Sequence, residues 1–144
     1  MGMAVMALKR DALDAIFSKL VRQRSGWTCE ACHINLEHET VNCHCAHIIG
    51  RRITRLRHDP RNAMTLCASC HFYYTDRPME WTAFVRKECG DSVMDELIRL
   101  SNESCKFPKG WKKEALAHYK SEEKRLAAAR AENYTGRFEF VGYW

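Results

Sequence analysis

The chain has 144 residues, enough for one compact domain with a hydrophobic core of its own. Hydrophobic residues make up 46% and charged residues 28%, which is ordinary for a globular protein, and no apolar run approaches the roughly 20 residues of a transmembrane helix. The formal net charge of +5 is too modest to establish a nucleic-acid partner by itself. Because the first residues lack the cleavage pattern of a secretory signal, we expect a cytoplasmic protein with no membrane partner.

The first predicted element is a basic amphipathic helix within residues 1–26. Apolar side chains recur at helical spacing from Leu8 to Leu20, and lysine and arginine occupy the opposite face. Gly26 is a typical residue to end such a helix. A plain packing role explains this pattern, and contact between the basic face and DNA is the weaker alternative.

Two Cys-x-x-Cys pairs follow, Cys29 with Cys32 and Cys67 with Cys70. Two intervening residues let the chain turn so that both sulfurs of a pair face one ion, and two pairs complete the tetrahedral set that structural zinc prefers. Without a secretory signal, this spacing favours metal over disulfides. We therefore predict one structural Zn²⁺ bound by these four thiolates. Such a site is coordinatively closed, so the zinc itself performs no chemistry.

Between the two pairs, the pattern predicts a strand within Thr40–Ile49 and a second strand at Met64–Leu66, followed by a helix that begins with Ala68–Thr75. Cys43 and Cys45 share one face of the first strand because side chains alternate with a period of two. We expect both to pack beside the zinc site as small apolar residues; competition for the zinc is the alternative.

The segment between these strands is rich in arginine. Five arginines fall within eleven positions: Arg51, Arg52, Arg55, Arg57 and Arg61. The planar guanidinium group contacts phosphate oxygens in a bidentate manner, so this segment is predicted to bind the backbone of DNA. A solvated loop without a ligand is the alternative.

Three further side chains stand in order along this region: His47, Asn62 and His71. Held by the two cysteine pairs, this set resembles the zinc-stapled HNH nucleases with the ββα-metal fold. The resemblance extends from about Trp27 to Tyr74 and is most specific in the run Asn62–His71.

Two shorter runs, Ala46–Arg51 and Asp59–Asn62, are most similar to the phage and prophage recombination-associated branch of that family. This similarity implies a phage- or prophage-encoded protein that acts in the cytoplasm of a bacterial host. It also implies DNA as the partner, contacted mainly through its backbone, by a monomer or weak dimer.

The resemblance implies a metal-dependent DNA endonuclease or nickase. In that family His47 would activate water, and His71 would hold a catalytic Mg²⁺, Mn²⁺ or another divalent transition ion. Asn62 would either bind that ion or orient the loop that carries His47. Many relatives place Asp or His directly before the general base, where this chain has Ala46. Asp59 is the nearest carboxylate and the candidate substitute, although it is better suited to cap a turn.

Downstream, helices are predicted from about Pro78 to Gly90, from Asp91 to Leu100 and from Trp111 to Glu132. The aromatic tail, Tyr134–Trp144, is too apolar for a disordered end and is expected to form a strand or to dock on the core. The expected fold class is α+β. An N-terminal helix over 1–26 precedes a ββα-metal core over 27–75 and a helical extension with the tail over 76–144, all in one compact unit.

A second function class remains open, namely a non-catalytic zinc-stabilised module that binds DNA or assists recombination. Such a module requires the zinc site but not His47, Asn62 and His71 together. Their joint presence, with an arginine-rich segment between them, favours the nuclease.

Overall fold

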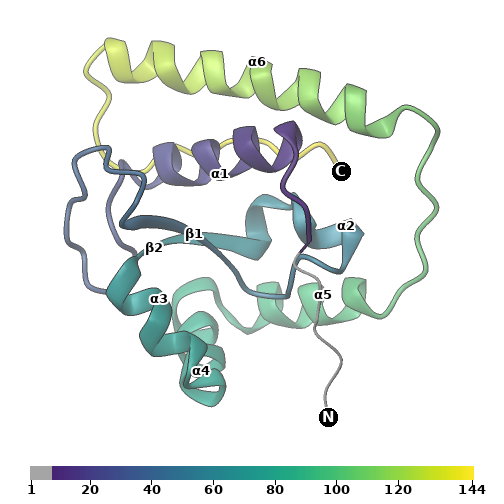
Figure 1. The fold of residues 1–144 in the computed structure, drawn as a ribbon, viewed down its shortest axis with the longest axis horizontal. Helices are drawn as coiled ribbons and strands as arrows, with labels where there is room; N and C mark the ends of the chain where they lie inside the picture. Colours follow the sequence, from purple (N-terminus) through teal and green to yellow (C-terminus); the bar gives the residue numbers. More distant parts are fainter. Residues whose placement is uncertain (1–7) are drawn as a thin grey trace.

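The computed structural model describes residues 8–144, and the start of the predicted N-terminal helix, residues 1–7, lies outside the described part. The chain is α+β, as expected, with helices around a small two-stranded antiparallel sheet (Figure 1). In chain order the elements are α1 (Ala12–Arg24), β1 (Cys43–His47), α2 (Thr54–Arg57), the 3-10 helix η1 (Pro60–Asn62), β2 (Ala63–Cys67), α3 (Ala68–Thr75), α4 (Pro78–Cys89), α5 (Asp91–Ser101) and α6 (Trp111–Ala131).

Helix α1 begins at Ala12 rather than near Leu8 because Asp11 caps it. The Asp11 carboxylate accepts a hydrogen bond from the Asp14 backbone N–H, and the Asp14 carboxylate accepts one from the Asp11 backbone N–H, both at 2.9 Å. This reciprocal capping box satisfies two backbone donors that a helix otherwise leaves free. Helix α1 is thereby anchored at the end that lies near the arginine-rich segment.

Strands β1 and β2 pair in a register that joins Cys43 to Cys67 and His47 to Ala63. Strand β1 is shorter than the predicted Thr40–Ile49, and β2 continues directly into α3. Because side chains alternate along a strand, Cys43, Cys45 and His47 share one face of the hairpin, while His44 and Ala46 share the other. The hairpin therefore presents histidines on both faces.

Helix α1 packs on the hairpin, and α6 packs against α1 (Figure 1). The core between them includes Phe17, Leu20, Val21, Tyr119 and Leu126, all at most 1% exposed. Helix α3 packs on the hairpin as well, and α4 packs against α3.

The aromatic tail docks on this core and forms no strand, which is one of the two outcomes expected for it. Phe140 is 4% exposed among the core side chains, and the Phe138 N–H donates a hydrogen bond to the Arg24 carbonyl at 3.0 Å. In Figure 1 this segment runs beside α1.

Among residues 8–144, no helix combines the length and the apolar character that crossing a membrane would require.

Candidate metal centres and active site

The structure brings the four cysteines of the two pairs together. Their four sulfur atoms, from Cys29, Cys32, Cys67 and Cys70, all lie within 4.8 Å of one another. Sulfurs that bind one zinc tetrahedrally, each about 2.3 Å from it, lie about 3.8 Å apart. The Cys32 and Cys67 sulfurs are separated by 3.8 Å. The four thiols therefore fit a tetrahedral metal such as zinc.

Each pair forms the same local turn. The Cys32 N–H points to the Cys29 sulfur at 3.5 Å, and the Cys70 N–H points to the Cys67 sulfur at 3.4 Å. Although burial opposes it, donation from backbone N–H groups lowers the pKa of Cys29 to about 7. These donors favour the thiolate, which is the form that binds metal.

Cys67 has three structural roles at once. It is the last residue of β2, it supplies one of the four sulfurs, and its side chain caps α3 by accepting from the Cys70 N–H. The four-cysteine cluster is therefore built into the junction between the hairpin and α3, directly before His71.

The other two cysteines of the hairpin lie outside this cluster. Cys43 is 1% exposed, and Cys45 packs against the core between α1 and α6. Burial raises the pKa of Cys43 to about 11 and that of Cys45 to about 12, so both remain neutral thiols. This environment fits the predicted packing role rather than competition for metal.

His47 ends β1 on the face that packs against α1. Its Nε2 lies 2.9 Å from the Arg57 carbonyl oxygen, and its ring lies 6.1 Å from the Phe17 ring, centroid to centroid. Because a carbonyl oxygen can only accept, Nε2 carries the proton and Nδ1 keeps a lone pair. Burial lowers the pKa of His47 to about 4, so the ring is neutral at physiological pH. A neutral imidazole with a free Nδ1 can accept a proton.

Residue Arg57, which supplies that carbonyl, is itself fixed by Asp14 of α1. The guanidinium donates to the Asp14 carboxylate from Nε at 2.8 Å and from Nη2 at 2.5 Å, and His58 Nε2 lies 2.8 Å from the same carboxylate. Asp11, Asp14 and His58 could also group around a metal, but the Asp14 oxygens already accept from these partners. This cluster is therefore an ion-pair network that links α1 to the segment beside His47.

Asn62 is fully buried and holds the loop that follows His47. Its Oδ1 accepts from the Ile49 N–H at 2.8 Å, and its Nδ2 donates to the carbonyls of Ile49 at 2.8 Å and Leu56 at 3.0 Å. These contacts correspond to the loop-orienting role, one of the two roles expected for this residue. A side chain used in this way has no exposed oxygen to offer to an ion.

His71 lies in the first turn of α3, and the structure pairs it with His44, a residue that the sequence analysis did not select. Their Nδ1 atoms are 2.8 Å apart, and His44 Nε2 lies 2.9 Å from the Val41 carbonyl oxygen. Since Nε2 must donate to that carbonyl, the Nδ1 lone pair of His44 points to His71.

This pair can hold a metal ion. Two nitrogens that bind one ion at right angles, each about 2.1 Å away, lie about 3.0 Å apart, close to the separation of this pair. A hydrogen bond from the ring to a backbone carbonyl is also the arrangement that commonly orients a metal-binding histidine. A signal for His44 was present in the sequence, because it lies two residues before Ala46 and so shares its face of β1.

The structure does not place all predicted site residues together. His47 projects from the α1 face of β1, whereas His44 meets His71 on the opposite face. Three residues of strand span about 10 Å, so the two groups are also offset along the hairpin. Within residues 8–144, β1 pairs only with β2, so its other edge is not covered by a strand. His47 lies on one side of this edge, and His44 with His71 lies on the other.

Most of the predicted phosphate-binding arginines already have partners in the chain. Arg57 pairs with Asp14, and both Arg55 and Arg61 pair with Asp59, at 3.6 and 2.8 Å. Asp59 also caps η1 by accepting from the Arg61 N–H at 2.9 Å, which is the capping role considered the better alternative for it. Arg52 has a partner as well.

Arg51 differs from these arginines because it makes no ion pair with a carboxylate among the described residues. Its Nη2 donates to the Leu8 carbonyl at 2.9 Å. The other arginines Arg55, Arg57 and Arg61 are paired with aspartate. A cluster of arginines in the sequence therefore does not by itself form a basic surface.

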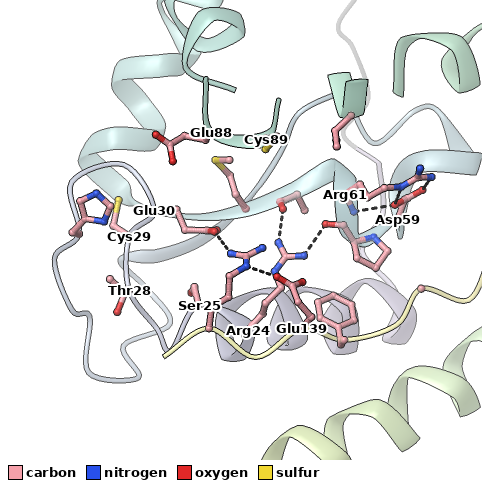
Figure 2. A pocket seen from close by; sticks show the side chains of 18 of the residues that line it. Arg24, Ser25, Thr28, Cys29, Glu30, Asp59, Arg61, Glu88, Cys89 and Glu139 are labelled. Carbon is pink, nitrogen blue, oxygen red and sulfur yellow. Dashed lines mark hydrogen bonds and ion pairs between the residues drawn. The ribbon is translucent and has the colours of Figure 1, made fainter. Parts of the chain in front are cut away.

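A cavity of about 870 Å³ lies elsewhere, along the outer edge of β2 (Figure 2). Arg24 is 2% exposed there and donates to the carbonyls of Pro60 and Ala63, at 2.8 and 2.6 Å. Arg137 pairs with Glu30 and Glu139. Neither His47 nor His71 lines this cavity, so it is separate from both histidine groups.

Comparisons with protein-family models, with curated proteins and with solved structures find no match for this chain.

Proposed function

We propose that this chain is a metal-dependent DNA endonuclease, a nicking hydrolase of the HNH type, with a ββα-metal core formed by β1, β2 and α3. The observation that carries this proposal is the pairing of His44 with His71. The two Nδ1 atoms lie 2.8 Å apart. His71 directly follows Cys70, the last residue of the four-cysteine cluster at the start of α3. The separation is that of one N–H···N hydrogen bond and also suits two nitrogens that share an ion, and the adjacent four-cysteine cluster favours the second interpretation.

His44 and His71 would hold the catalytic ion, and His44 takes the place of the ligand that Ala46 does not provide. Imidazole ligands suit Mn²⁺ and other transition ions, while Mg²⁺ prefers oxygen ligands. Two protein ligands leave positions for water and substrate oxygens. When bound, the ion would act as a Lewis acid toward the phosphate and its leaving oxygen.

His47 would act as the general base through Nδ1. Its Nε2 proton donates to the Arg57 carbonyl, which holds the ring in one tautomer and one orientation. A pKa near 4 makes the free imidazole a weak base, and a phosphate anion beside it would raise that pKa. Asn62 would keep the loop after His47 in place through its three hydrogen bonds.

The substrate strand would lie across the outer edge of β1. This course accounts for the position of His47 on one face and of His44 with His71 on the other. Burial also lowers the pKa of His71, so His71 is a neutral ligand at physiological pH. His44 and His71 would supply the electrophile that phosphodiester hydrolysis requires. A general base acts through one hydrogen bond or one water, so His47 would supply the proton acceptor in a conformation in which the bound strand brings both groups to one phosphate.

The test is a plasmid nicking assay that compares wild type with His44→Ala, His47→Ala and His71→Ala. EDTA, Mg²⁺, Mn²⁺ and Ni²⁺ are compared in parallel, and zinc content is measured for every variant. His33→Ala is the matched control, because His33 is exposed. We expect metal-dependent nicking that all three variants lose and the control keeps, with one zinc bound throughout.

A wild type that is folded and zinc-loaded but cuts neither supercoiled, single-stranded nor branched DNA with any of these ions would refute the nuclease proposal. The chain would then be better explained as a zinc-stabilised DNA-binding or recombination accessory module. Activity that survives His44→Ala but not His71→Ala would instead refute only the role of His44.

A further inference from the structure

Two arginines of the N-terminal region converge on one hydroxyl group. Arg10 Nη2 donates to Ser18 Oγ at 2.6 Å, and Arg22 Nη1 donates to the same oxygen at 3.2 Å. Ser18 is 7% exposed. The guanidinium groups are therefore held close together, and the charge of Arg10 acts with burial to lower the pKa of Arg22.

A third arginine, Arg51, lies near this pair, because its Nη2 donates to the carbonyl of Leu8, two residues before Arg10, at 2.9 Å. The positive charges of Arg10, Arg22 and Arg51 all act on the Cys45 thiol, and that of Arg51 also acts on His47. The charges of the three guanidinium groups thus act on the face of the hairpin that carries Cys45 and His47.

None of these three arginines forms an ion pair with a carboxylate in residues 8–144, and the sequence of residues 1–7 contains no acidic residue. By contrast, Arg55, Arg57 and Arg61 all pair with aspartate. The Nε atoms of Arg22 and Arg51 are also buried without a hydrogen-bond partner. The cluster therefore has both uncompensated charge and unused donors.

Like charges held together in this way repel one another, and an anion bound among them removes that repulsion. Guanidinium groups match the paired oxygens of a phosphate better than a single carboxylate, because each offers a planar fork of donors. Their charges act on the face of β1 that carries His47, which the substrate strand would approach in the proposed function.

We propose that Arg10, Arg22 and Arg51 form a binding site for backbone phosphates of DNA on the His47 face of the hairpin. This inference rests on the proposed nuclease function for its choice of DNA as the anion. It moves the main phosphate contacts from the arginine-rich segment to helix α1 and Arg10, which lies just before the Asp11 cap, with Arg51 as the only member shared with the sequence-based set.

The test measures DNA binding separately from cleavage. Fluorescence anisotropy of a labelled duplex is followed across a salt series in EDTA, with Arg10→Gln, Arg22→Gln and the double variant. Arg99→Gln is the matched control, because Arg99 lies on α5, is exposed and is paired with Glu96 and Glu103. It removes the same charge from a surface that already contains the compensating carboxylates.

The slope of log K against log[salt] is negative. We expect each of the two single variants to reduce its magnitude by about 1, and the double variant by about 2. Arg99→Gln should leave the slope unchanged. Arg10→Gln keeps the test decisive if Arg22→Gln alters the fold, since Arg22 also lies 5.3 Å from the centroid of the Trp27 ring.

Equal slopes for wild type and the Arg10→Gln variant would overturn the inference, as would a wild type that does not bind DNA at low salt. Inorganic phosphate is added as a competitor, to distinguish a site for DNA phosphates from a site for small free anions. Thermal stabilisation by phosphate, without any binding of DNA, would show a small-anion site and overturn the DNA assignment. Arginine-dependent DNA binding without nicking would refute only the proposed function.

Discussion

Substitution of Asn62 separates the two roles that this residue could have. In the structure its amide makes three hydrogen bonds to the loop between His47 and β2, and the side chain is 0% exposed. Asn62→Ala removes all three and leaves buried backbone groups without partners. At about 1 kcal/mol for each bond, the free energy of unfolding should fall by about 3 kcal/mol. The corresponding drop in melting temperature is roughly 10 °C for a domain of this size.

Asn62→Asp is the decisive comparison. A carboxylate keeps the acceptor for the Ile49 N–H but places negative oxygens against the carbonyls of Ile49 and Leu56. If the residue orients the loop, Asn62→Asp should destabilise the protein at least as much as Asn62→Ala. If it binds the catalytic ion instead, an added carboxylate should keep or strengthen the metal response.

Urea unfolding of both variants, with zinc content held at one equivalent, measures the first effect. The Mn²⁺ concentration that gives half-maximal nicking measures the second. An Asn62→Asp protein with wild-type stability and an unchanged or lower Mn²⁺ requirement would refute the loop-orienting role.

Three other outcomes are expected. Cys29→Ser should abolish stoichiometric zinc binding and weaken cooperative unfolding, whereas Cys45→Ser should still bind one zinc, as measured by a colorimetric zinc assay. Folding holds the pKa of His47 near 4, below the ordinary value near 6.5, so the unfolded chain binds more protons between these values. Stability should therefore fall as the pH drops through this range, and His47→Gln should flatten the dependence in urea titrations at several pH values; an unchanged profile would contradict the burial argument. Finally, His44→Ala should weaken Mn²⁺ binding by isothermal titration while one zinc stays bound.

The features that follow from short-range sequence patterns could be predicted. The spacing within each Cys-x-x-Cys pair dictates the turn that directs two sulfurs to one point, so the four-cysteine cluster was predictable without a structure. The Asp59-Pro60 pair likewise indicated a capped turn, and Asp59 caps η1. The two strands and α3 followed from alternation and from the position of the second pair.

The features that depend on long-range packing could not be predicted. Arg57 pairs with Asp14, 43 positions earlier, and no local pattern indicates that this arginine is neutralised. His44 was within reach of a simple rule, because the period of two places it on the face of Ala46. It lies three residues before His47, whereas the family pattern places the second metal ligand directly before the general base. Which histidine meets His71 depends on how α3 packs on the hairpin, and that is set by tertiary contacts.

The position of Cys67 has a consequence for how the protein responds to its surroundings. One residue ends β2, contributes a sulfur to the four-cysteine cluster and caps α3, so a metal bound there would connect the hairpin to the helix. By mass action, each tenfold rise in free zinc above the dissociation constant adds about 1.4 kcal/mol to the stability of this junction. The supply of zinc in the cell would then govern how much of the protein holds His71 beside His44. A structural metal would in this way set the fraction of molecules in which the two histidines meet.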